Sequence, residues 1–84
     1  MANPIVIVFY TKPGCHLCED AETLLEVAGR HWLIEIRPTN ILRDRAVYDL
    51  YWNRIPVLEG ADGSTLEPPI TRESLTAFIR RQSL

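Results

Sequence analysis

The stretch TKPGCHLCEDAETLL, residues 11–25, places two cysteines three positions apart, directly after the apolar run IVIVFY at residues 5–10. A continuous run of β-branched and aromatic residues is typical of a strand covered on both faces, so we expect this run at the centre of a sheet. Pro13 and Gly14 favour a turn. The stretch therefore predicts a strand, a turn and a helix, with Cys15 and Cys18 in the first helical turn.

The helix is indicated by apolar residues at helical spacing, with acidic residues on the opposite side, and by Gly29 as a C-terminal stop. The positions that we expect to face the core are Leu17, Ala21, Leu24, Leu25 and Ala28. Residues 32–37 then alternate, with Trp32, Ile34 and Ile36 on one face, which predicts a second strand nearer the edge of the sheet. Strand, helix and strand together form a right-handed βαβ unit.

A short second helix follows in the sequence. Asp44 is a good N-cap for it, and Asn40 is an alternative cap one turn earlier. We expect this helix to bury Val47, Leu50 and Tyr51.

The last third of the chain predicts a hairpin and a third helix. Asp62 and Gly63 form a turn signal between the short apolar segments 56–59 and 64–66. Thr71 is the predicted N-cap of the last helix. The residues that we expect this helix to bury are Leu75, Phe78 and Ile79. The order β-α-β-α-β-β-α predicts a single α/β domain over residues 1–84, with a four-stranded mixed sheet flanked by three helices.

Composition excludes some classes of partner. The net charge is -2 and the nine basic residues are scattered, which argues against a nucleic-acid surface. The longest apolar run, residues 5–10, is far shorter than the ~20 residues that cross a bilayer, and it lacks the flanks of a signal peptide. We therefore expect a cytoplasmic monomer that binds neither nucleic acid nor membrane.

That compartment bears on the cysteine pair. Cytosolic thiols are kept reduced, so a close pair there is more often catalytic or metal-binding than structural. A cross-link over four residues also constrains the unfolded chain by only ~1.9 kcal/mol, against ~4.7 for a hundred-residue loop. A disulfide between these two cysteines would therefore stabilise the fold only weakly.

The motifs resemble those of the glutaredoxins. KPGCHLC at residues 12–18 lies between the first strand and the first helix, and YWNRIPVL at residues 51–58 opens the third strand about forty residues later. Together with the strand order, these segments are similar to small bacterial glutaredoxin-like proteins of the thioredoxin superfamily. The resemblance implies a thioredoxin/glutaredoxin fold and a thiol–disulfide oxidoreductase that reduces or exchanges protein or glutathione mixed disulfides.

The cysteine spacing suits that chemistry. Three helical steps rotate ~300° and rise ~4.5 Å, which keeps the two Cα atoms within the ~4.4 to 6.8 Å that a disulfide requires. The positive end of the helix dipole favours a thiolate at Cys15, and Lys12 adds a positive charge. We therefore expect Cys15 to be the nucleophile and Cys18 the resolving cysteine.

The resemblance implies further substrate-binding residues. Pro56 is expected to be a cis proline that faces the nucleophile, which leaves the backbone of Ile55 free to pair with an extended substrate. Lys12 matches the basic residue before the motif, and Thr71 matches a polar helix cap that contacts glutathione. Apart from the resemblance, Arg54 just before the proline is a candidate partner for a substrate carboxylate, and an exposed surface arginine is the equal alternative.

Two departures from the glutaredoxin pattern bear on glutathione. Leu17 stands where an aromatic residue is usual, and residues 67–70, Glu-Pro-Pro-Ile, stand in place of a glycine pair. Prolines offer no N–H to a carboxylate, and Glu67 repels one. We therefore expect no bound cofactor and weak use of glutathione as a co-substrate. The expected partners are a disulfide-containing protein and a thioredoxin- or glutathione-type reductant.

Two other functions stay open. A zinc site would need His16 and His31 as third and fourth ligands, and their spacing argues against it, so no metal ligand is assigned. The resemblance also allows an iron–sulfur cluster held between two chains. The remaining alternative is a binding module whose cysteines do no chemistry.

Overall fold

A four-stranded sheet forms the centre of the protein, for which a computed structural model describes residues 3–83. The strands are β1 (Ile5–Thr11), β2 (Ile34–Asn40), β3 (Val57–Gly60) and β4 (Thr65–Leu66). β1 runs parallel to β2 and antiparallel to β3, and β4 is antiparallel to β3, in the order β2-β1-β3-β4. The predicted mixed sheet with the first strand inside it is therefore confirmed.

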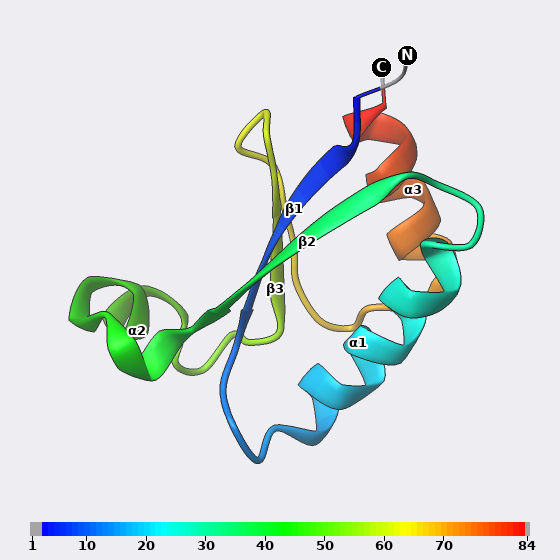
Figure 1. Cartoon of the computed structure of the whole chain (residues 1–84). Coiled ribbons are helices and arrows are strands. Elements are labelled where there is room, and N and C mark those ends of the chain that lie inside the picture. The colour runs from blue at the N-terminus through cyan, green and yellow to red at the C-terminus, as the bar shows by residue number, and fades with distance from the viewer. Residues whose placement is uncertain (1–2, 84) are drawn as a thin grey trace.

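Three α-helices and one short 3₁₀ helix complete the fold. They are α1 (His16–Ala28), the 3₁₀ helix η1 (Ile41–Arg43), α2 (Arg45–Tyr51) and α3 (Arg72–Gln82). Figure 1 shows α1 and α3 together on one side of the sheet, and α2 on the other side, near the end of β2. The order β-α-β-α-β-β-α is the predicted one.

The main core lies between the sheet and the α1–α3 pair. Its buried side chains come from β1, α1, β3 and α3: Ile7, Phe9, Cys18, Ala21, Leu25, Leu58, Leu75, Phe78 and Ile79. A smaller cluster of Ile41, Tyr51 and Val57 lies where α2 packs. Because α2 has only seven residues, it covers one end of the second face. Val6 and Val8 of β1 are therefore only partly buried, and the prediction that both faces of this strand are fully covered is wrong.

Both predicted caps in the middle of the chain are used, each by a different helix. Asn40 begins η1 and accepts a hydrogen bond from the N–H of Leu42 at 2.9 Å. Asp44 begins α2 and accepts from the N–H groups of Ala46 and Val47 at 3.0 and 3.2 Å. The two caps satisfy N–H groups that a helix start otherwise leaves unpaired.

The hairpin and the last helix also follow the prediction. Gly63 has a φ of 85°, a conformation that glycine adopts without strain, in the turn between β3 and β4. Thr71 is the N-cap of α3, and its hydroxyl and the Ser74 hydroxyl each bond the other residue's N–H in a capping box. The three predicted core residues of α3 are buried.

Three expectations about single residues are wrong. Trp32 lies outside β2, which begins at Ile34 and continues through Pro38; an edge strand tolerates the missing proline N–H. Leu17 is 59% exposed, because Cys18, one step of about 100° further round α1, takes the position that faces the core. Leu50 is 54% exposed because its neighbour Tyr51 faces inward.

Candidate active site

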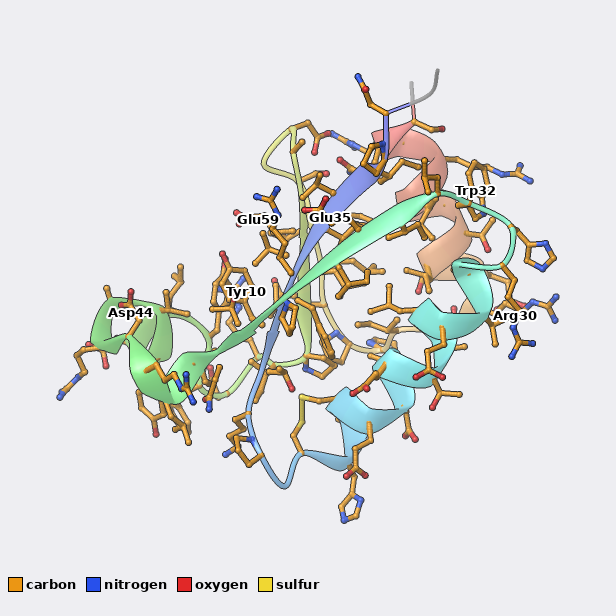
Figure 2. All side chains as sticks on the ribbon, viewed as in Figure 1. Tyr10, Arg30, Trp32, Glu35, Asp44 and Glu59 are labelled. Carbon is orange, nitrogen blue, oxygen red and sulfur yellow. A yellow bond between two sulfur atoms is a disulfide. The ribbon has the colours of Figure 1, made fainter. Side chains whose placement is uncertain are left out.

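The two cysteines lie at the start of α1, joined by a disulfide with a Cα–Cα distance of 5.2 Å. Figure 2 shows this bond in yellow at the first turn of the helix. Cys15 is the N-cap, with extended backbone, and its Sγ accepts a hydrogen bond from the N–H of Cys18 at 3.1 Å. Cys15 is partly exposed, whereas Cys18 is 3% exposed and belongs to the core. An incoming disulfide can therefore reach Cys15 but not Cys18.

Charged side chains near the first turn are exposed. His16 Nδ1 lies 3.4 Å from Glu19 Oε2, and the two side chains are 95% and 68% exposed. Ion pairs of this kind contribute little and are screened by salt. The contacts that the structure shows at the Cys15 sulfur are therefore the start of α1 and the N–H of Cys18, both of which favour negative charge there.

The loop before β3 holds the predicted proline. The Ile55–Pro56 peptide bond is cis, and Pro56 is fully buried. Ile55 packs against the main core, as Cys15 does. The N–H of Ile55 donates to the Tyr51 carbonyl at 3.2 Å, so the expectation that the whole Ile55 backbone is free is wrong for this group. Only the carbonyl of Ile55 is left for a substrate.

Arg54, which we expected to meet a substrate carboxylate, already holds one. Its Nε and Nη2 donate to the two carboxylate oxygens of Glu67 at 2.8 and 2.5 Å. The guanidinium carbon lies 5.3 Å from the centre of the Tyr51 ring. The hydrogen bonds from Arg54 lower the pKa of the Glu67 carboxyl. Thr71, four positions after Glu67, uses its hydroxyl to cap α3.

A tyrosine pair on the α2 side of the sheet escaped the sequence analysis. The hydroxyl of Tyr10 donates to Glu59 Oε1 at 2.8 Å, and Figure 2 labels both side chains. The rings of Tyr10 and Tyr51 have centroids 4.5 Å apart. Burial, reinforced by the bond to Glu59, raises the pKa of Tyr10 to about 12. Glu59 of β3 lies directly opposite Val8 of β1, and Tyr10 is two positions further along β1. Tyr10 is therefore the diagonal neighbour of Glu59 on the same face of the sheet. Only this register reveals the contact.

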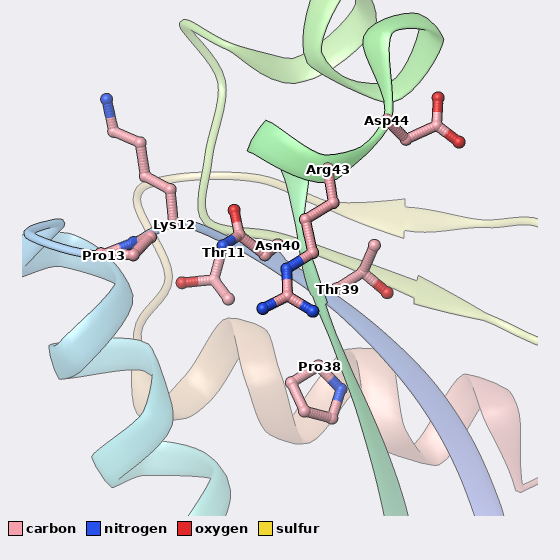
Figure 3. Close-up of a pocket in the computed structure, with 8 residues that line it drawn as sticks. All are labelled: Thr11, Lys12, Pro13, Pro38, Thr39, Asn40, Arg43 and Asp44. Atoms are coloured by element: carbon pink, nitrogen blue, oxygen red, sulfur yellow. The ribbon is translucent and has the colours of Figure 1, made fainter.

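An open pocket of about 550 Å³ lies beside the cysteine loop, where β1 and β2 end. Carboxyl ends of parallel strands are a common place for ligands in open α/β sheets. Figure 3 shows the guanidinium of Arg43 pointing into the pocket and the carboxylate of Asp44 pointing away from it. The lining residues are Thr11, Lys12, Pro13, Pro38, Thr39, Asn40, Arg43 and Asp44. Of these residues, only Lys12 is predicted from the sequence to have a functional role.

The structure adds two observations on metals and membranes. Among residues 3–83, no three histidine, cysteine or acidic side chains gather as metal ligands would. None of the helices in that part of the chain combines the length and the apolar character that crossing a bilayer requires.

The sequence pattern of the Glutaredoxin-like domain family (DUF836) matches residues 6–80. The chain belongs to this glutaredoxin-like family. No curated protein matches its sequence.

Solved structures share this fold. Protein XcR50 from X. campestris is 28% identical, with a TM-score of 0.80 over 89% of this chain and 96% of its own. Protein Ne2328 from Nitrosomonas europaea is 28% identical, with a TM-score of 0.78 over 93% and 94% of the two chains. A mutant thioredoxin from Halobacterium salinarum, at 18% identity and a TM-score of 0.75 over 98% and 77%, shares the fold. The predicted thioredoxin/glutaredoxin fold is therefore confirmed.

Proposed function

We propose that this glutaredoxin-like protein is a thiol–disulfide oxidoreductase that reduces or exchanges protein or glutathione mixed disulfides. The observation that supports the proposal is the unequal placement of the two sulfurs. Cys15 is partly exposed at the start of α1 with an N–H directed at its Sγ, and Cys18 lies covered one turn further on. This arrangement suits one cysteine for attack on a substrate and the other for release.

The reaction proceeds in two exchanges. The thiolate of Cys15 attacks one sulfur of the substrate disulfide, forms a mixed disulfide, and releases the other substrate sulfur as a thiolate that takes a proton from solvent. Cys18 then loses its proton and attacks the Cys15 sulfur, which releases the second substrate thiolate and forms the Cys15–Cys18 disulfide. The substrate gains two electrons, and a thioredoxin- or glutathione-type reductant returns two electrons to the protein.

Other parts of the site have supporting roles in this proposal. The carbonyl of Ile55 accepts a backbone hydrogen bond from an extended substrate segment, in the manner of an added strand. Lys12, three residues before Cys15 and exposed, adds positive charge on the approach to the thiolate. The activity needs no resident cofactor and suits the cytoplasm, where thiols are kept reduced.

A trapping experiment tests the proposal. In Cys18→Ser the second exchange cannot occur, so a substrate with a disulfide should accumulate as a mixed disulfide on Cys15, detected by mass spectrometry and reversed by a small thiol. Cys15→Ser is the matched control and should trap nothing. Equal trapping by both variants, or none by Cys18→Ser with peptide, protein and glutathione disulfides, would overturn the proposal.

A further inference from the structure

One ion pair joins two loops of the protein. The first loop precedes β3 and contains Arg54; the second, residues 67–70, precedes α3 and begins with Glu67. Ile55 of the first loop and Ile70 of the second pack against the same core cluster as Cys15. We call the ion pair of Arg54 and Glu67 the clasp.

The guanidinium of Arg54 is engaged on several sides. Both of its bonds to Glu67 are made in the parallel, two-oxygen geometry with which arginine binds a free carboxylate. Its Nη1 donates to the carbonyl of Leu50 at 3.4 Å, and its plane lies near the Tyr51 ring. Glu67 therefore occupies the place that a substrate carboxylate would take on this arginine.

An incoming carboxylate has to displace one that the chain itself supplies. An intramolecular partner has a high effective concentration, so the free ligand competes at a disadvantage. The displaced Glu67 would also add a negative charge beside the substrate, and Pro68 and Pro69 have no N–H with which to hold either carboxylate. The two side chains are 40% and 35% exposed, so the disadvantage is about 1.5- to 5-fold, the range for partly exposed ion pairs.

We infer that the clasp is a specificity-determining element that disfavours disulfides carrying a carboxylate beside the reacting sulfur, as glutathione does. The substrate class it leaves is a protein disulfide flanked by neutral or basic residues. This inference rests on the proposed function, because it concerns which disulfides Cys15 meets.

Two matched substrates isolate the carboxylate. One neutral peptide is joined through its cysteine to glutathione, and the same peptide is joined to the diethyl ester of glutathione. The measured quantity is the ratio of the KM for the acid substrate to the KM for the ester. Glu67→Gln frees Arg54 and should lower this ratio about 1.5- to 5-fold. Arg54→Gln leaves the charge of Glu67 uncompensated and should raise the KM ratio. In the double variant no arginine remains to bind the substrate, so the lower ratio of Glu67→Gln should be lost.

A control separates the clasp from general charge. Glu73→Gln removes an equal charge from the exposed first turn of α3, outside the clasp, and should leave the ratio unchanged. The inference is overturned if Glu67→Gln leaves the ratio unchanged, or if Glu73→Gln lowers it as much. Thermal unfolding shows whether Arg54→Gln folds. If it does not, Arg54→Lys takes its place, because lysine keeps the positive charge but cannot bind both oxygens of Glu67. In the Arg54→Lys background, Glu67→Gln should lower the KM ratio by a smaller factor than it does in the unmodified protein.

Failure of the inference is distinguishable from failure of the proposed function. If the unmodified protein turns over no disulfide, the proposed function fails. The clasp is then measured by binding alone, from the NMR titration of S-methylglutathione and its diethyl ester, which cannot be reduced. Tighter binding of the acid by Glu67→Gln than by the unmodified protein, with no such change for the ester, supports the clasp, and equal binding overturns it.

Discussion

The thiolate at Cys15 is the quantity on which the proposed chemistry depends, and Cys18→Ser allows it to be measured alone. The substitution retains the backbone N–H of residue 18, which lies 3.1 Å from the Cys15 sulfur. A hydrogen bond to a charged acceptor contributes about 1.5–3 kcal/mol. The helix dipole acts through the same N–H groups, so its contribution is already contained in this range.

Stabilisation of this size changes the thiolate population considerably. At about 1.4 kcal/mol per pKa unit, it raises the thiolate-to-thiol ratio roughly 10- to 150-fold above that of a free cysteine. A free thiol is about 3% ionised at pH 7, so Cys15 should be between about one quarter and four fifths ionised. Glu19 opposes the effect, but it is 68% exposed, and we expect Glu19→Gln to change the ratio less than about twofold.

The assay is the ultraviolet absorbance of the thiolate in Cys18→Ser as a function of pH, with the rate of iodoacetamide alkylation as a second measure. Cys15→Ser provides the comparison, and its remaining cysteine, 3% exposed, should react more slowly. The reasoning is refuted if Cys15 titrates as a free thiol does, or if Cys18 is alkylated faster than Cys15.

Three further substitutions test other contacts. Tyr10 has a folded-state pKa of about 12 against about 10 when unfolded, so the stability it contributes is present below about pH 10 and is lost as the pH rises through about 12. Between pH 8 and pH 11, the free energy of unfolding measured in urea should therefore fall less in Tyr10→Phe than in the unmodified protein, and equal falls would contradict this. Thr71→Ala should lower the free energy of unfolding by about 1 kcal/mol in urea titrations, whereas Thr71→Ser should retain most of it; equal effects would exclude the cap as the cause. Leu17→Tyr, at a site that is 59% exposed, should change stability by less than about 0.5 kcal/mol and lower the KM for a glutathione mixed disulfide; an unchanged KM would show that contact area at this position is not limiting.

Local signals in the sequence were sufficient for the order of the elements and for the position of the cysteines. An N-cap side chain bonds to an N–H two or three residues further along the chain, so Asn40, Asp44 and Thr71 could be identified from their neighbours alone. The same holds for Cys15 and Cys18, because the N-cap and the third residue of one helix are local neighbours whose separation the start of the helix sets. The part of the site that could be predicted from the sequence is the part formed by one helix and the residue that begins it.

Contacts between distant segments needed the tertiary structure. Tyr10 meets Glu59 across 49 positions, and a one-residue change of strand register would place their side chains on opposite faces. Arg54 could be recognised as a carboxylate partner, but its partner Glu67 lies 13 positions away in a loop whose path no local pattern determines. Whether the guanidinium of Arg54 is available to a substrate or already bonded to Glu67 depends on how the two loops pack. The core beneath the loops determines that packing.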